Sequence, residues 1–323
     1  MDFLERSHVA DRMVAFQSLD FGEEMISQKQ VALIAPPNYE EVIRGAAAVD
    51  EARVLKRAFG LLGVELSIQC FNDPTVKWSS FDAVLPKTAW NYFNEPLRFA
   101  EWLDHLADSG IQSINPVELI RWNHDKAYLA DLRDLGVRVA PFELFVAGTE
   151  PGEILDSLAG VGWQNIVIKP SISGAAQRTS TLTLDQSGQI EALSGEILSD
   201  SGLILQPFFD EIPNIGEWSI FFIDGEITHS VLKVPKSGDF RCQEVWGAHT
   251  ERQEIPRWIA EAAKGAIEAA PMVPTYGRVD GFVRDGEFNL MELELIEPYF
   301  YFEHAPQGTV GRFARAIVSK IET

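Results

Sequence analysis

Cysteine is scarce in this sequence, with only Cys70 and Cys242 among 323 residues. Two cysteines are too few for a disulfide framework or a cysteine-based zinc site. Long apolar runs are also missing, and none approaches the roughly 20 residues that a membrane-spanning helix needs. The first residues, MDFLERSHVADRMVAF, scatter charges among apolar side chains, which is not typical of a signal peptide. We therefore expect a cytoplasmic protein without a membrane partner.

Positive charge is the second shortage. The chain has 27 Lys and Arg against 48 Asp and Glu, a formal net charge of −21 at pH 7. Nucleic acid and anionic lipid both require a positive surface, so we expect neither as a partner. If the protein handles an anionic substrate, its few cations must be concentrated where the chemistry takes place. Hydrophobic residues make up 46% of the chain, which is typical of a globular protein and excludes disorder.

The first third of the chain alternates strands with helices after a polar N-terminal extension over 1–29. Such alternation indicates an open, mainly parallel sheet. The predicted elements are strands at 31–37, 64–71 and 81–90 and helices at about 47–62 and 97–110. We therefore predict an α/β, Rossmann-like domain over 30–118.

The rest of the chain has a different pattern, in which strands and hairpins dominate. Asp-Gly pairs at 224–225 and 285–286 lie between strand-like segments and predict two-residue hairpins. The predicted helices are two short ones within 117–136, broken near Asn123, and others at 153–162, 256–270 and 310–322. We expect an α+β region over 119–323, with a small lobe at about 130–207 and a large lobe at about 208–323.

Three carboxylates in the second hairpin carry the strongest chemical signal. Glu292 and Glu294 lie two residues apart on a predicted strand, so both side chains point to one face. Asp280, on the preceding strand, is close enough to join them. Converging carboxylates repel one another unless a cation neutralises them, and magnesium takes oxygen ligands of this kind. The alternative is a solvated acidic hairpin, but the apolar residues around the pair indicate a strand enclosed on both faces.

Two lysines are candidates for binding phosphate. Lys169 ends an apolar strand and precedes a loop of small residues, so that its ammonium and backbone N–H groups can surround an anion. The loop is not a Walker P-loop, because Gly-Lys-Ser/Thr is missing at its end. Lys126 is the second candidate. Considered alone, each lysine is more typical of a solvated surface residue.

A third segment has features of a nucleoside site. Gln206 and Phe208 flank a proline at the end of an apolar strand, where backbone groups and an aromatic face suit an adenine. Glu217 follows and is well placed to accept hydrogen bonds from ribose hydroxyls. The alternative is a β connection broken by proline.

Taken in order, these residues resemble the ATP-grasp superfamily over roughly residues 30–318. In that family a Rossmann-like (pre-ATP-grasp) domain precedes two lobes that grip ATP, so the resemblance implies ATP and magnesium, as two ions. The implied roles are Lys126, Lys169 and the loop residues Ser171, Ser173 and Gly174 at the phosphates, Gln206 and Phe208 at adenine, Glu217 at ribose, Asp280, Glu292 and Glu294 at magnesium, and Arg278 at the transferred phosphate.

Within the superfamily, INPVELIRWNHDKAYLADL and MELELIEPYFYF resemble the glutathione-synthetase-like branch that includes the D-cycloserine-forming cyclo-ligase. This resemblance implies a ligase that joins a carboxylate to an amine through an acyl phosphate, on a small amino-acid-derived substrate. Ring closure within one molecule and a role in antibiotic biosynthesis are part of what it implies. Two departures bear on the metal and the substrate: Glu294 replaces a common asparagine, and Asn91 replaces an aspartate of a Trp-Asp-Tyr element.

Substrate contacts are predicted chiefly from cations in the segment LKVPKSGDFRCQ, since a cationic cluster suits a carboxylated amino acid. The residues assigned to the substrate are Lys233, Lys236, Arg241, Trp90 and Asn91, and those assigned to catalysis are Arg278, Lys169 and Arg241. A solvated hairpin edge is the alternative for the cluster. Cys242 is predicted to be a buried thiol rather than a nucleophile.

Three other functions remain open from the sequence. An intermolecular ligase would join two molecules into a dipeptide-type amide, and a kinase would release a phosphorylated product. A non-catalytic nucleotide-binding module would do neither, although the combination of cations and carboxylates speaks against it. The extension over 1–29 either covers the site or packs on a partner subunit, as in a homodimer.

Overall fold

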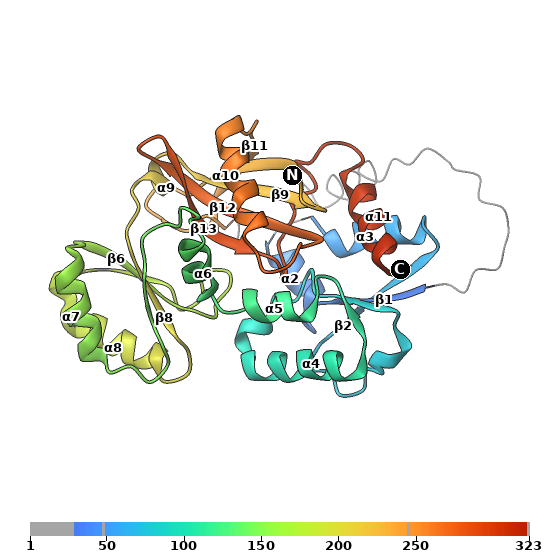
Figure 1. Ribbon diagram of the computed structural model, residues 1–323, viewed down its shortest axis with the longest axis horizontal. Coiled ribbons are helices and arrows are strands. Elements are labelled where there is room, and N and C mark those ends of the chain that lie inside the picture. Colours follow the sequence, from blue (N-terminus) through green and yellow to red (C-terminus); the bar gives the residue numbers. More distant parts are fainter. Residues whose placement is uncertain (1–28, 47–48, 244–245, 322–323) are drawn as a thin grey trace.

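Three β-sheets form the architecture of the computed structural model, which describes residues 29–46, 49–243 and 246–321 (Figure 1). The extension predicted over 1–29 lies outside the described residues, except for Lys29, which begins the first strand. In Figure 1 the N-terminal sheet lies at the lower right, a small sheet at the left, and a large sheet above them. The three sheets follow one another along the chain.

The N-terminal sheet is parallel, as the sequence predicts, and has the strand order β2-β1-β3-β4. Its elements are β1 (Lys29–Ile34), α2 (Tyr39–Ala46), α3 (Glu51–Gly60), β2 (Val64–Gln69), β3 (Ala83–Leu85), α4 (Pro96–Ser109) and β4 (Gln112–Ser113), with short 3-10 helices at Trp78–Ser80 and Tyr92–Asn94. Val31 and Leu33 share a core with α3, whereas Ala32 and Ile34 share another core with α4. A central strand buried on both faces explains the continuous apolar run.

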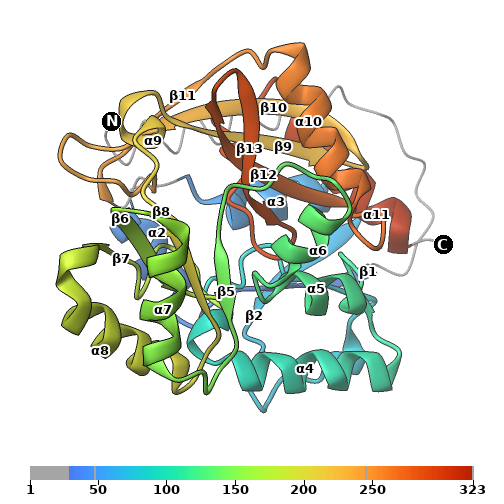
Figure 2. The same cartoon turned by 60° about the vertical axis from the view of Figure 1, so that its left-hand side comes forward.

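The small sheet is antiparallel, with the strand order β5-β8-β6-β7. Its strands and helices, with the two helices that lead into it, are α5 (Val117–Asn123), α6 (Tyr128–Asp134), β5 (Glu143–Phe145), α7 (Pro151–Val161), β6 (Asn165–Pro170), β7 (Ser180–Thr183), α8 (Ser187–Leu198) and β8 (Leu203–Pro207), and a 3-10 turn lies at Leu184–Gln186. Helices α7 and α8 pack together, and their apolar residues share one core with β6 and β8 (Figure 2).

The large sheet is antiparallel, with the strand order β11-β10-β9-β12-β13. Its elements are α9 (Glu211–Asn214), β9 (Glu217–Ile223), β10 (Glu226–Val234), β11 (His249–Arg252), α10 (Arg257–Glu268), β12 (Tyr276–Arg284) and β13 (Glu287–Glu294). Both predicted Asp-Gly hairpins are confirmed: Asp224 and Gly225 have φ angles of +50° and +74°, and Asp285 and Gly286 have +54° and +78°. Two consecutive residues with positive φ are the requirement of a type I′ turn.

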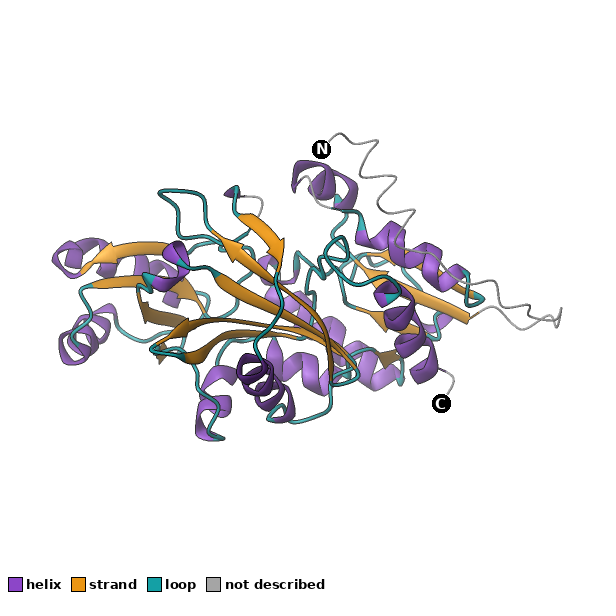
Figure 3. Cartoon of the chain, turned by 90° about the horizontal axis from the view of Figure 1, so that it is seen from above, coloured by secondary structure: helices purple, strands orange, loops and turns teal. Residues whose placement is uncertain are grey.

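The large sheet joins the other parts of the molecule. Its strands share one core with α6 and α10, and a second core with the N-terminal sheet and the last helix, α11 (Thr309–Ile321). Seen from above, its long strands extend from the small lobe toward the N-terminal sheet (Figure 3). The sheet therefore forms the platform on which both neighbouring units meet.

Three helices in the described residues are not predicted from the sequence: α2, α8 and the four-residue α9. Helix α2 is short, and α8 has the sequence SGQIEALSGEIL, in which two glycines and two serines lower the intrinsic helix propensity. Packing on the small sheet overrides that propensity, because Ile190, Ile197 and Leu198 of α8 are buried there. None of the helices in the described residues is long and apolar enough to cross a lipid bilayer.

Candidate active site

A row of charged residues crosses one face of the large sheet. In the register, Glu217 of β9 lies opposite Lys233 of β10, and Asp280 of β12 lies opposite Glu292 of β13. Arg278 lies opposite Glu294, one pleat further along the same pair of strands. Residues that lie directly opposite in an antiparallel pair share a face, so these side chains are neighbours.

Two β-bulges align this row. In the hairpin of β9 and β10, the register shifts by one residue between Ile227 and His229, so that Lys233 lies opposite Glu217. A second shift, between Asp280 and Gly281, places Asp280 opposite Glu292 rather than Met291. Because a slip of one residue turns every following side chain to the other face, the bulges decide which charges meet.

The cations of the row are held by its carboxylates. The Arg278 guanidinium donates to Asp280, with an Nε–Oδ2 distance of 2.8 Å, and also pairs with Glu294. The Lys233 ammonium lies 3.3 Å from Glu217 Oε1 and 3.4 Å from Asp280 Oδ1. Burial opposes ionisation of Asp280, but Arg278 and Lys233 hold its pKa below the ordinary value.

The pKa of Glu294, in contrast to that of Asp280, is raised. Burial, with the nearby Glu292 and Asp280 carboxylates, raises the pKa of Glu294 to about 7, although Arg278 acts against this shift. Glu292 is paired with Lys126, whose Nζ lies 3.2 Å from Glu292 Oε1, and one third of its side chain stays exposed. The sheet thus presents one ionised, deeply buried carboxylate and two more accessible ones.

Side chains from α5 and α6 fix the edge strand β13, which carries Glu292 and Glu294. Asn123 donates from Nδ2 to the Leu293 carbonyl at 2.6 Å and accepts from the Leu295 N–H at 2.8 Å. The Tyr128 hydroxyl accepts from the Leu293 N–H at 2.9 Å. These bonds replace the ladder of a neighbouring strand, so the unpaired edge of β13 is satisfied and its position is fixed.

The two candidate lysines face this row from the side of the small lobe. Lys126 Nζ donates to the Ser173 carbonyl at 2.5 Å, and its backbone N–H donates to the Ser171 carbonyl at 2.9 Å. Because the Lys126 ammonium also pairs with Glu292, it links the small-residue loop to the charged row. Burial and the neighbouring Lys126 lower the pKa of Lys169 to about 8. No ion pair holds Lys169 among the described residues, which leaves its ammonium available for an anion.

The loop over 171–178 has an unusual backbone. Ala175, Ala176 and Arg178 all have φ angles between +51° and +56°, in the left-handed region that residues with a Cβ seldom adopt. Gly174 lies against the ring of Phe93, and a Cβ at this position would be 2.3 Å from the nearest ring carbon. Arg178 anchors the end of the loop through Asp200, at 2.9 Å.

A cavity of about 140 Å³ lies between the loop, the small sheet and the charged row. The predicted site residues that line it are Lys126, Lys169, Ser173, Gly174, Gln206, Phe208, Glu217, Arg241 and Glu292. Gln206 and Phe208 are at the end of β8, and Phe208 meets Phe240 edge to face at 6.3 Å. One cavity therefore gathers the lysines, the aromatic segment and an accessible carboxylate.

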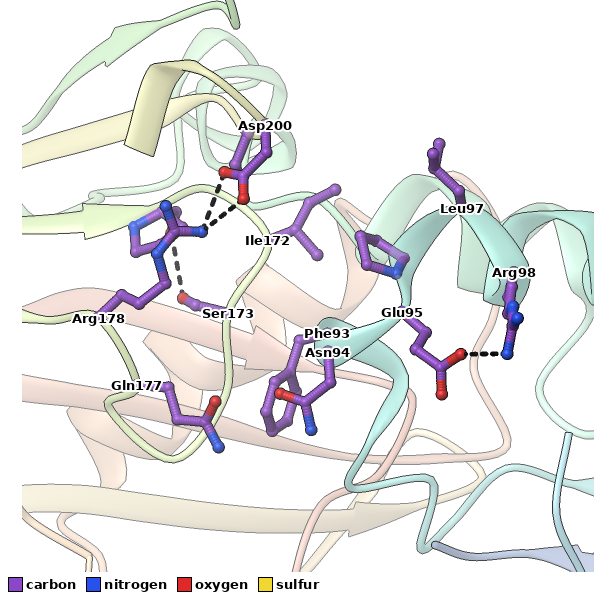
Figure 4. Close-up of a pocket in the computed structure, with 13 residues that line it drawn as sticks. Phe93, Asn94, Glu95, Leu97, Arg98, Ile172, Ser173, Gln177, Arg178 and Asp200 are labelled. Atoms are coloured by element: carbon purple, nitrogen blue, oxygen red, sulfur yellow. Dashed lines mark hydrogen bonds and ion pairs between the residues drawn. The ribbon is translucent and has the colours of Figure 1, made fainter. Parts of the chain in front are cut away.

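A larger cavity, of about 470 Å³, lies on the other side of the same loop (Figure 4). Phe93, Glu95 and Arg98 approach it from the N-terminal domain, and Ile172 and Arg178 from the small lobe. Its arginines are engaged by neighbouring carboxylates, Arg98 by Glu95 and Arg178 by Asp200. It shares only Ser173 with the smaller cavity and contains none of the charged row.

The three cations that the sequence groups together lie in different environments. Lys233 is 5% exposed and belongs to the charged row, while Lys236 is exposed and does not line the cavity. Arg241 lines the cavity, but Asp239 holds its guanidinium at 2.7 Å and the Trp246 ring covers it at 3.8 Å. Strand β10 ends at Val234, so Lys233 alone lies on the sheet, and a turn at Lys236–Asp239 follows; the three cations therefore do not form the single cluster that the sequence predicts.

The other predicted residues are Ser171, Trp90, Asn91 and Cys242. Ser171 is buried, and its hydroxyl has no hydrogen-bond partner among the described residues. Trp90 stacks on Tyr39 at 5.6 Å, and the amide oxygen of Asn91 is buried without a partner in the described part of the chain. Cys242 is buried beside the cavity, and burial raises its thiol pKa, as expected for a thiol that is not a nucleophile.

Comparison with known proteins assigns this arrangement to a family. The cycloserine biosynthesis protein DcsG of Streptomyces lavendulae is 30% identical to the chain over 295 residues, which are 83% of this chain and 93% of that protein. The chain belongs to the DcsG family. Residues 31–115 also match the family described as the N-terminal domain of D-cycloserine synthetase DcsG.

Solved structures show the same fold as this DcsG-family chain. The crystal structure of D-cycloserine synthetase DcsG has a TM-score of 0.81 at 24% identity and covers 90% of this chain and 99% of that chain. A D-alanine–D-alanine ligase from Bacillus anthracis complexed with ATP has a TM-score of 0.66 at 15% identity, covering 91% and 97%. The ATP-grasp ligase PsnB, complexed with a precursor variant, Mg and ADP, has 0.60 at 16%, covering 91% and 99%.

These comparisons confirm the predicted ATP-grasp fold and the resemblance to the cyclo-ligase branch. Membership in the DcsG family makes the chain an ATP-dependent ligase that forms C–N bonds. The alternative of a non-catalytic nucleotide-binding module is therefore wrong.

Sequence reasoning missed two features of the DcsG-family site. Lys87 and Glu51 form a fully buried ion pair, with an Nζ–Oε2 distance of 2.5 Å, beneath the N-terminal side of the site. Glu297, on the segment after β13, is a fifth carboxylate in addition to the four of the row, and it is 6% exposed. A signal for Lys87 was present, because it ends an apolar run beside a proline, as Lys169 does.

The donor set suits magnesium, although its carboxylates also bind cations of the chain. Asp280, Glu292 and Glu294 offer only hard oxygen donors, and Glu292 opens into the cavity that the two lysines line. Within the described residues, however, no three His, Cys, Asp or Glu side chains are arranged to hold a metal ion by themselves. The Arg278 guanidinium lies between Asp280 and Glu294 and pairs with both, so these two carboxylates are held apart.

Proposed function

We propose that this DcsG-family ligase closes a ring within one small amino-acid-derived substrate, through an acyl phosphate. The chain's relative is named for cycloserine biosynthesis, and a matching structure is named D-cycloserine synthetase. D-cycloserine, or a ring of the same kind, is therefore the proposed product, in the biosynthesis of an antibiotic amino-acid analogue.

The chemistry requires activation of a carboxylate. An oxygen of the substrate carboxylate attacks the γ-phosphorus of ATP, the bond to the bridging oxygen breaks, and ADP leaves. The nitrogen of the same substrate then attacks the acyl carbon, the carbon–oxygen bond breaks, and phosphate leaves with the former carboxylate oxygen. The nitrogen loses its proton to solvent. Direct attack on the carboxylate fails because oxide is a poor leaving group.

The cavity supplies positioning and charge for this sequence. Lys126, Lys169 and the backbone of the loop at 171–178 are proposed to bind the phosphates, with Gln206 and Phe208 at the adenine and Glu217 at the ribose. Arg278 is proposed to face the transferred phosphate. Charge neutralisation and alignment of the reacting atoms are the main catalytic effects expected in such a site.

The carboxylates of the row are proposed to hold magnesium, consistent with the donor chemistry of Asp280, Glu292 and Glu294. When bound, the metal would neutralise phosphate charge and act as a Lewis acid. The chain's own contribution is the spacing of these carboxylates, which the bulge beside Asp280 sets.

The single observation that supports this proposal most strongly is the shared cavity. Lysines from two elements, the aromatic end of β8 and an accessible carboxylate of β13 meet there, in a chain that matches DcsG over most of its length. The sequence assigned Lys236 and Arg241 to the substrate and Arg241 also to catalysis. These roles are not part of the proposal, because Lys236 is exposed and Arg241 is held by Asp239.

A mass-spectrometric screen with ATP and magnesium tests the proposal. Amino-acid derivatives that carry a second nitrogen are incubated singly and in pairs, and ADP release is measured in parallel. We expect ADP release with one derivative alone and a product lighter by one water. Loss of water only between two partners would indicate a dipeptide-type ligase, and a stable phosphorylated product would indicate a kinase; either result would contradict ring closure.

A further inference from the structure

Glu297 is a buried carboxylate that the proposed chemistry does not use. It lies three residues beyond Glu294, and Trp90 Nε1 of the N-terminal domain donates to its backbone carbonyl at 2.9 Å. The residue is 94% buried, because its relative exposure is 6%, and its Oε2 atom has no hydrogen-bond partner among the described residues. A buried polar atom without a partner is costly in a folded protein and calls for an explanation.

The nearby cations do not supply the missing partner. Lys126 and Arg278 are close enough to favour the charged form of Glu297. Lys126, however, is bound by Glu292 and the Ser173 carbonyl, and Arg278 is bound by Asp280 and Glu294. Burial, with Glu294 and Glu292 nearby, raises the pKa of Glu297 well above its ordinary value. The carboxyl therefore lies within the charged site but outside its ion pairs.

The type of the unpartnered atoms indicates the type of ligand. The side-chain oxygen of Asn91, the residue after Trp90, is also buried without a partner among the described residues. The Asn91 oxygen is an acceptor, and a bound cation would favour the ionised form of Glu297, in which Oε2 is an acceptor too, so a positively charged donor suits both atoms. A primary ammonium carries three donors and a positive charge, which suits a carboxylate better than a neutral group does.

The surroundings favour an ammonium over a second magnesium ion. Burial, with the nearby Glu297 carboxyl, raises the pKa of the Tyr92 and Tyr276 hydroxyls, so both hydroxyls lie near this carboxyl. Trp90 and Tyr39 stack beside this segment. Aromatic faces attract organic cations, whereas magnesium keeps several waters and requires more oxygen ligands.

We propose that the Glu297 carboxylate binds the primary ammonium group of the amino-acid-derived substrate, beside the carboxylates assigned to magnesium. This assignment rests on the proposed function and adds to it, because it requires a substrate with a free amine. The substrate would then be held at two ends, by Glu297 at its amine and by the catalytic groups at its carboxylate.

Calorimetric titration of D-cycloserine into the protein saturated with ADP and magnesium tests the proposal. D-cycloserine carries a primary amine on its ring, and the same ring without the amine is the matched probe. We expect the wild type to bind D-cycloserine at least about tenfold more tightly than the desamino ring, since a hydrogen bond to a charged group contributes about 1.5–3 kcal/mol. Glu297→Gln should remove this difference, and Glu297→Asp should restore part of it.

Glu287→Gln is the control, because Glu287 lies at the far end of β13 and pairs with Arg138 at the surface. It should leave the affinities for both rings unchanged. Unchanged D-cycloserine binding by Glu297→Gln, an equal loss for both rings, or no preference for the amine in the wild type would overturn the proposal. A higher magnesium requirement with unchanged amine binding would assign Glu297 to the metal and would also overturn it. Since binding is measured without turnover, failure of ring closure is recognised separately in the screen.

Discussion

At the scale of single residues, burial changes the charges on which the site depends. Lys169 is the clearest case, because desolvation and the adjacent Lys126 lower its pKa to about 8. Its ammonium is therefore charged at neutral pH but less strongly so than an exposed lysine. A charge held in this way, without an ion pair in the described part of the chain, is suited to meet an anion.

Lys169→Gln should raise the KM for ATP roughly ten- to a hundredfold, because a hydrogen bond to a charged group contributes about 1.5–3 kcal/mol. In the wild type, Lys169 loses its proton as the pH rises through about 8, so the KM for ATP should increase above that pH. Steady-state kinetics between pH 6 and 10 would check both effects. A wild-type profile that stays flat, or one that the variant reproduces, would show that Lys169 does not bind ATP.

The buried pair of Lys87 and Glu51 gives a prediction about stability. Both side chains are fully buried, and Glu51 Oε1 also accepts from the Phe300 N–H at 2.8 Å. Lys87→Met leaves a buried carboxylate without its cation, which should lower the free energy of unfolding by about 3–5 kcal/mol. The double variant Glu51→Gln/Lys87→Met should be more stable than Lys87→Met. Urea unfolding measures both, and equal losses would mean that the charge left behind is not the cause.

At the scale of elements, bulges and a tight loop contact assemble the site. Without the shift beside Ile227, Leu232 would lie opposite Glu217, and Lys233 would turn away from Asp280. The shift beside Gly281 acts in the same way on Asp280. Gly281 itself has no room for a side chain, because a Cβ would lie 2.4 Å from the Asn289 carbonyl oxygen. Irregular backbone therefore produces the regular row of charges.

The loop contact at Gly174 gives a prediction about ATP binding. Gly174→Ala would force the loop away from Phe93, because the added Cβ overlaps the ring. The KM for ATP should rise roughly tenfold, the effect of about 1.4 kcal/mol of lost binding. Steady-state kinetics would check this value.

A second substitution supplies the rescue for that prediction. Phe93→Ala removes the ring, so Phe93→Ala/Gly174→Ala should recover part of the ATP affinity. Gly188→Ala, on the exposed side of α8 with nothing near its added Cβ, should leave the KM for ATP unchanged. If Gly174→Ala binds ATP like the wild type, the contact with Phe93 does not position the loop.

Local features of the site could be predicted from the sequence, whereas features that depend on backbone irregularities could not. Periodicity and the Asp-Gly turns predict both hairpins, and the spacing of Glu292 and Glu294 predicts their shared face, because these signals are local. The position of Lys233 between Glu217 and Asp280 depends on a bulge that has no local signal in the sequence. The partner of Arg241 was two residues away, but its geometry depends on a turn at Asp239.

At the scale of the whole molecule, the N-terminal domain and the large lobe share one hydrophobic core. Residues of β1, α3 and α11 belong to it together with residues of β9 and β12. The boundary near residue 118 therefore separates sheets but not independent cores, and the predicted domain limits stay a prediction. Shared packing of this kind depends on contacts between distant segments, which composition and periodicity do not reveal.

The cations of this acidic chain are concentrated near the candidate site. The chain has a surplus of 21 negative charges, yet Lys126, Lys169, Lys233 and Arg278 are collected around the cavity and the charged row. An acidic protein can therefore present cations to ATP and a substrate carboxylate, because those cations are concentrated in one place.

Activation of a carboxylate by ATP is the central claim, and tracing of a heavy oxygen isotope tests it most directly. A cyclising substrate with a labelled carboxylate would be converted with ATP and magnesium, and the released phosphate analysed by mass spectrometry. We predict one labelled oxygen in each phosphate and the other in the ring carbonyl. Unlabelled phosphate, with both labelled oxygens kept elsewhere, would contradict the acyl phosphate and the proposed function that depends on it.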